Sequence, residues 1–104
     1  MSSDLRTKVL LSLQRALLGE ITASMRGIAV QWSPEQIAVR VYTDGKSTAE
    51  AQDEFDAAVM TQLTADFATP ERGGPTLGFE FVECRAPAPL PDWGCLAYAR
   101  AERE

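Results

Sequence analysis

Acidic side chains are the most abundant chemical groups in the segment 44–71 of this chain, which has 104 residues. The segment holds seven acids and one base, a net charge of −6, whereas the whole chain carries −5. The acids are Asp44, Glu50, Asp53, Glu54, Asp56, Asp66 and Glu71. Carboxylates can act as an acid–base pair in a cleft, bind a metal ion, or attract a basic partner. The choice among these uses depends on the elements that carry the acids and on what else the sequence provides.

Catalytic chemistry lacks its usual partners, because the sequence contains no histidine. This absence removes Ser-His-Asp and Cys-His catalysis and most zinc sites. The stretch ERGGPTLG at 71–78 lacks the lysine and the spacing of a phosphate-binding loop. Asp53, Glu54 and Asp56 are expected to diverge around a helix instead of converging on a substrate or a metal ion. The sequence therefore predicts no enzymatic activity, no cofactor and no metal site.

Two cysteines, Cys84 and Cys95, are the remaining reactive groups. They flank the Pro-rich stretch APAPLPDWG at 86–94, so a hairpin there would place them opposite each other as a disulfide or a redox pair. We favour the simpler interpretation of two small strand residues, because free cysteine is readily buried and the sequence contains no CxxC motif. Without an export signal, we expect reduced thiols in a cytoplasm.

The composition also narrows the possible partners. A pI near 4.7 argues against nucleic acid, because phosphate binding requires a basic face. No apolar run approaches the roughly 20 residues that span a bilayer, so we expect no membrane association. The N-terminal stretch 1–19 has no clear cleavage site and is interpreted as a helix of the mature protein. An acidic face favours a basic protein partner, met in a fast and salt-sensitive encounter.

The hydrophobic spacing predicts the elements that position these side chains. The expected elements are a helix at 4–18, strands at 28–32 and 37–42, a helix at 48–67, and strands at 77–82 and 95–102. A turn containing Pro34 joins the first two strands into a hairpin, and residues 101–104 are expected to fray. The order α-β-β-α-β-β predicts an α+β fold in a single domain, 1–104. We expect a two-layer sandwich in which two helices cover one face of a four-stranded antiparallel sheet.

The expected helix at 48–67 carries its apolar stripe on one side and most of its acids on the other. Acids near its start complement the helix dipole, so a solvated face explains part of the pattern. It does not explain why no lysine or arginine occurs from 47 to 71, since opposite charges four residues apart stabilise a helix. Asp66 is an exception, because its angle falls near the apolar stripe. We expect it beyond the rim of the sheet or opposite a basic group of a partner.

Two aromatic residues add to the candidate interface. Tyr42 lies on the minority face of its strand, and Trp93 lies in a loop where a large ring is hard to bury completely. The alternative for Trp93 is that it folds back to cover the sheet edge. The expected partner-binding residues are Asp44, Glu50, Asp53, Glu54, Asp56, Asp66, Glu71, Tyr42 and Trp93.

Several stretches together resemble a known group of proteins. They are LLGEI at 17–21, IAVRVYTDG at 37–45, ADF at 65–67 and PLPDWGCLAYAR at 89–100. With them the chain resembles short bacterial immunity proteins of the kind paired with contact-dependent growth inhibition toxins. The strand near 95–99 departs from this pattern, with Cys95 and Ala97 where bulkier residues are expected.

This resemblance implies a non-enzymatic cytoplasmic inhibitor that binds its cognate toxin domain and carries no catalytic residues. Many such toxins are nucleases, whose basic surfaces an acidic inhibitor would match. The alternative is a homodimerising structural or regulatory α+β domain without catalytic activity. It is suggested by the strand at 77–82, which has apolar side chains on both faces.

Overall fold

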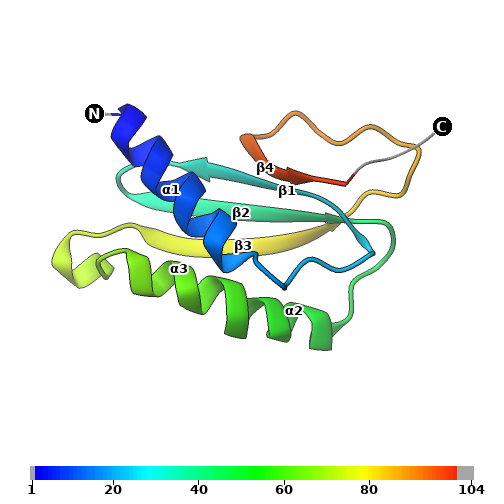
Figure 1. Ribbon diagram of the computed structural model, residues 1–104, viewed down its shortest axis with the longest axis horizontal. Coiled ribbons are helices and arrows are strands. Elements are labelled where there is room, and N and C mark those ends of the chain that lie inside the picture. Colours follow the sequence, from blue (N-terminus) through cyan, green and yellow to red (C-terminus); the bar gives the residue numbers. More distant parts are fainter. Residues whose placement is uncertain (1, 101–104) are drawn as a thin grey trace.

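The computed structural model describes residues 2–100 and places four strands in one sheet with helices packed against it (Figure 1). The elements are α1 (Ser2–Ala16), β1 (Met25–Trp32), β2 (Gln36–Thr43), α2 (Ala49–Phe55), the π-helical turn η1 (Asp56–Met60), α3 (Thr61–Asp66), the 3₁₀ turn η2 (Pro70–Arg72), β3 (Thr76–Glu83) and β4 (Cys95–Ala99). This arrangement confirms the α+β class. The tail at 101–104, which was expected to fray, lies outside the described residues.

The sheet is mixed, so the prediction of a fully antiparallel sheet is wrong. Its strand order is β3-β2-β1-β4, and β1 pairs antiparallel with both of its neighbours. In contrast, β2 and β3 are parallel over their whole length. The reason is the helical segment 49–66 between them, which carries the chain back along the sheet so that β3 starts at the same end as β2.

The last two strands do not form the hairpin that was expected around the Pro-rich stretch. β3 and β4 lie at opposite edges of the sheet, and β4 runs in the same direction as β2 and β3. The segment 84–94 must therefore travel back along the sheet before β4 begins. Cys84 and Cys95 are consequently not opposite each other, and both are unpaired and half-buried.

The segment 84–94 lies over the face of the sheet that the helices leave open. Trp93 stacks on Arg40, whose side chain points to the opposite face from the core residue Val39. Leu90 lies so close to Gly27 that a Cβ added there would be 2.7 Å from its methyl group. Glycine at position 27 leaves room for Leu90, and a larger side chain would require that methyl group to shift.

One hydrophobic core lies between the sheet and the helices. Helix α1 contributes Val9 and Leu13, and the second helical segment contributes Phe55, Val59 and Leu63, all buried against the inward residues of β1 and β2. Figure 1 shows α1 lying across the strands and the second segment running alongside β3. Burial of each such side chain stabilises the fold by about 1.5–3 kcal/mol.

The second helical segment is not one regular helix, although the sequence predicted one at 48–67. It begins at Thr48, whose hydroxyl accepts a hydrogen bond from the Ala51 amide at 3.0 Å. A π-helical turn follows at Asp56–Met60, where the amide of Thr61 bonds to the carbonyl of Asp56.

No helix among residues 2–100 is long and apolar enough to cross a membrane.

Candidate functional site

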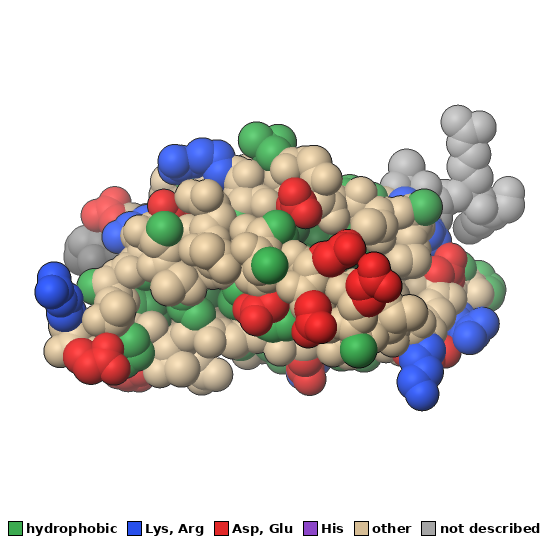
Figure 2. Space-filling view, turned by 90° about the horizontal axis from the view of Figure 1, so that it is seen from below, with side chains coloured by type: hydrophobic (Ala, Val, Ile, Leu, Met, Phe, Trp, Pro, Cys, Tyr) green, Lys and Arg blue, Asp and Glu red, His purple; other side chains and the backbone are tan. Residues whose placement is uncertain are grey.

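Four acids form an exposed group on the second helical segment, and we call this group the acidic helix face. Its members are Glu50, Asp53, Glu54 and Asp56. Figure 2 shows acidic side chains gathered on this side of the molecule, while the basic side chains visible there lie toward the ends. Within residues 2–100, none of the four makes an ion pair. Their negative charge is therefore available to a partner.

The acidic helix face carries a small cost for the isolated protein. Glu50 and Asp53 are three residues apart, as are Asp53 and Asp56, while Glu54 follows Glu50 by four. Like charges at these spacings destabilise a helix by about 0.2–0.5 kcal/mol per pair. Glu50 lies in the first turn, where the helix dipole offsets part of this cost. The other three acids receive less of that compensation because the dipole acts mainly within the first turn.

The carboxylate of Asp44 is bonded within the molecule instead of being free at the surface. Its carboxylate accepts hydrogen bonds from the Ala86 amide at 2.8 Å and from the Arg100 guanidinium at 2.9 Å. The Ala86 N–H, followed by Arg100, lowers the pKa of Asp44 below its ordinary value. Asp44 thus fastens the start of the 84–94 segment and the end of β4 to the end of β2.

Asp66 also bonds within the molecule, at neither of the two positions expected for it. The side chain is half-buried and accepts a hydrogen bond of 2.5 Å from the hydroxyl of Ser12, a buried residue of α1. It therefore joins α3 to α1. Glu71 is exposed in η2, at the far end of the helical segment from α2. The structure does not bring it next to the acidic helix face.

The two aromatic candidates lie on the open side of the sheet. Tyr42 is fully buried, and its hydroxyl lies close enough to Arg40 to raise the pKa of that guanidinium, although within residues 2–100 it makes no hydrogen bond of regular geometry. Trp93 is half-buried, with its ring 4.2 Å from the Arg40 guanidinium, which in turn pairs with Glu80 at 2.7 Å. Of the two alternatives stated for Trp93, the structure shows the ring folded back onto the sheet. Part of it remains accessible.

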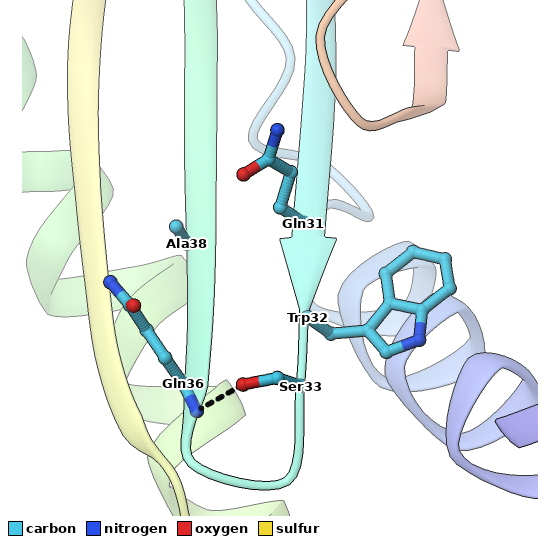
Figure 3. Close-up of a pocket in the computed structure, with 5 residues that line it drawn as sticks. All are labelled: Gln31, Trp32, Ser33, Gln36 and Ala38. Atoms are coloured by element: carbon cyan, nitrogen blue, oxygen red, sulfur yellow. Dashed lines mark hydrogen bonds between the residues drawn. The ribbon is translucent and has the colours of Figure 1, made fainter.

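Sequence reasoning missed two shallow hollows on the sheet, because their shape depends on how strands and the 84–94 segment come together in space. One hollow of about 140 Å³ lies at the turn between β1 and β2 and is lined by Gln31, Trp32, Ser33, Gln36 and Ala38. Figure 3 shows Trp32 pointing away from Gln31 and Ala38. It also shows the Ser33 hydroxyl accepting a hydrogen bond from the backbone amide of Gln36, at 3.2 Å. A second hollow, of about 210 Å³, has Gly78, Glu80 and Trp93 in its wall.

These hollows offer contact area rather than acid–base chemistry. The first contains no carboxylate, amine or guanidinium, and Glu80 in the second is already paired with Arg40. In the part of the chain that the structure describes, no group of three acidic or cysteine side chains is arranged to hold a metal ion. The acidic helix face and the open side of the sheet, which lie on opposite sides of the sheet, are therefore the candidate binding surfaces.

Comparison with known proteins adds one match. The model of the family described as "MafI2 immunity protein" matches residues 6–102. This range includes every residue predicted to bind a partner. A search of the curated proteins finds no match.

Proposed function

The chain belongs to the MafI2 immunity protein family, and from this premise we propose that it neutralises a cognate toxin by binding it through the acidic helix face. Family membership confirms the resemblance to toxin-immunity proteins, and it supports a protein toxin as the partner. We propose that the protein acts by occupation of the toxin's surface and performs no catalysis itself. The toxin is expected to be one that bacteria deliver to their neighbours by contact.

The observation that carries this proposal is the exposure of four like charges without a counterion inside the described chain. A toxin that cleaves nucleic acid needs a basic surface to hold phosphates. Carboxylates placed against that surface would meet the same arginine and lysine side chains. We therefore propose a basic toxin, and a nuclease as its natural class.

The four acids and the aromatic candidate contribute in different ways. The acidic helix face acts at long range, where complementary charge raises the association rate. Trp93, with part of its ring exposed, acts at short range, where burial of an aromatic ring slows dissociation. Glu71 adds charge at the far end of the helical layer, whereas we assign Asp44, Asp66 and Tyr42 to the stability of the fold.

The test uses the cognate toxic domain, which we expect to be encoded beside this gene. Cells that produce the domain should stop growing, and co-production of this protein should restore growth. With purified proteins, we expect the association rate to fall about threefold between about 0.05 and 0.5 M salt, because screening shortens the reach of exposed charges. Failure to restore growth would overturn the proposed function. A rate indifferent to salt would overturn the role of the acidic helix face.

We expect this encounter to take place in the cytoplasm. Cys84 and Cys95 lie at the ends of strands on opposite edges of the sheet, where they cannot form a disulfide without rearrangement of the fold. Such unpaired thiols remain reduced in a cytoplasm.

A further inference from the structure

The outer edge of β3 offers unused backbone hydrogen bonds. On its inner side, the Thr76 amide bonds to the Glu35 carbonyl at 2.9 Å, and the Cys84 amide bonds to Thr43 at 2.8 Å. In a parallel ladder such contacts alternate, so the even-numbered residues of β3 face β2. The odd-numbered residues turn their amides and carbonyls outward, and no other part of the described chain bonds to them. They are Leu77, Phe79, Phe81 and Glu83.

This edge lacks most of the features that usually prevent a strand from pairing with another chain, the exceptions being the charges of Glu80 and Glu83. It is eight residues long, contains neither proline nor lysine, and pairs with β2 without any shift of register. The opposite edge is different, because β4 has five residues and a register shift against β1. The inward side chains of β3 are half-buried, unlike the buried ones of the central strands, as expected at an uncovered edge.

Negative charge lies along one side of this edge. Phe55 packs against both Phe79 and Phe81, with ring centroids 5.4 Å apart in each pair. Its neighbours Glu54 and Asp56 belong to the acidic helix face and lie on the two flanks of Phe55 around the helix, so one flank of that face borders the helix side of the β3 edge. On the other side of the strand lies the hollow whose wall includes Gly78 and Trp93.

We propose that an extended, basic segment of the toxin binds the outer edge of β3 as an additional strand of the sheet. This inference rests on the proposed function and specifies which part of the surface is used. Backbone hydrogen bonds would provide affinity, and alternate side chains of the added strand would provide specificity. Side chains toward the helices would be lysine or arginine, facing the acidic helix face. Those on the other side would be apolar or small, beside Trp93.

A toxin segment fits this edge better than a second copy of the chain. Pairing of two β3 edges would bring two acidic helix faces close to each other, and like charges held together disfavour association. A basic strand would instead supply the counterions that the four acids lack. Charge complementarity therefore favours a basic toxin segment over a second copy of the chain at the β3 edge.

Amide hydrogen exchange of the full chain tests the proposal, first alone and then saturated with the toxic domain encoded beside the gene. We expect the outward amides of Leu77, Phe79 and Phe81 to exchange at least tenfold more slowly in the complex. The inward amides of Gly78 and Glu80 are the internal control, because β2 already protects them. Tight binding without added protection at the outward amides would overturn the proposal and leave the proposed function standing.

Two further outcomes are informative in the same experiment. If the toxic domain does not bind at all, both the edge proposal and the proposed function are overturned. If the outward amides of the protein alone become protected as its concentration rises, the occupant of the edge is a second copy, and the toxin-strand proposal is overturned.

A matched pair of variants at Glu83 provides a second measurement. Glu83→Pro removes an outward amide while the bonds to β2, which use even-numbered residues, remain possible. Glu83→Ala removes the same carboxylate but keeps the amide, so it controls for the loss of charge and of the contact with Arg85. We expect the proline variant to bind the toxic domain about tenfold more weakly than the alanine variant. Equal affinities of the two folded variants would contradict the proposal that the toxin adds a strand at this edge. The exchange measurement uses the natural chain, so it does not depend on whether either variant folds.

Discussion

Neutralisation of the acidic helix face should stabilise the isolated protein while it weakens the encounter with the toxin. The variant combines Asp53→Asn, Glu54→Gln and Asp56→Asn, which removes three like-charge pairs at helical spacings of three and four residues. Each such pair destabilises a helix by about 0.2–0.5 kcal/mol. We therefore expect the free energy of unfolding to rise by about 1 kcal/mol. Glu50 remains to complement the helix dipole.

The effect on association follows from the exposure of the three acids. One pair of unit charges about 10 Å apart in water contributes about 0.4 kcal/mol before screening. Screening reduces this to about 0.3 kcal/mol at 0.01 M salt and about 0.15 kcal/mol at 0.1 M. If each acid faces one basic group, the loss of three pairs lowers the association rate about fourfold at 0.01 M and about twofold at 0.1 M.

Stopped-flow association and urea unfolding measure the two quantities on the same protein. A control variant with Asp4→Asn, Glu35→Gln and Asp92→Asn also loses three exposed acids, so both variants change the net charge from −5 to −2. The control should retain most of the natural association rate because its acids lie on other elements. Equal losses of rate in both variants would show that only net charge matters. A loss of stability in the first variant would contradict the account of like-charge repulsion.

Two further predictions concern the stability of the fold. Asp44→Asn should flatten the dependence of the free energy of unfolding on pH in acid, as measured by urea unfolding between about pH 5 and pH 2. Contacts with Ala86 and Arg100 lower the pKa of Asp44 in the folded protein. Its contribution to stability is therefore present above its ordinary pKa and is lost as the pH falls through the lowered value. Ser12→Ala should lower the free energy of unfolding by about 1–2 kcal/mol, because Asp66 loses a donor across the contact between α1 and α3, and an unchanged urea midpoint would count against that contact.

Much of the fold could be predicted from hydrophobic spacing, but the direction of β3 could not. Phe55, Val59 and Leu63 are buried as their spacing indicated, because each repeats at an interval set by the geometry of one helix. Alternation of apolar residues identifies a strand without specifying its neighbour, and β3 alternates in the same way whether it pairs with β2 or β4. The segment 84–94 is long enough either to close a hairpin or to cross the sheet. Packing against Arg40 and Gly27 and the hydrogen bond from Ala86 to Asp44 hold it in the crossing path.

In the candidate site, too, features set by local sequence could be predicted and those set by distant residues could not. The exposure of Asp53, Glu54 and Asp56 depends on one helix and its buried face, which a helical wheel captures. The positions of Asp44 and Asp66 depend on groups that are more than 40 residues away in the sequence, since the Ala86 amide lies at a separation of 42 and the Ser12 hydroxyl at 54. No local pattern encodes such partners.

The division of the second helical segment into a buried stripe and a charged outer side has an evolutionary consequence. Substitutions at exposed positions generally change stability by less than about 0.5 kcal/mol, whereas those at Phe55 or Val59 would open cavities in the core. The outer side is therefore free to diversify while the scaffold beneath it persists. Related chains can in this way follow toxins that change, exchanging one recognition pattern for another without the need to invent a new architecture.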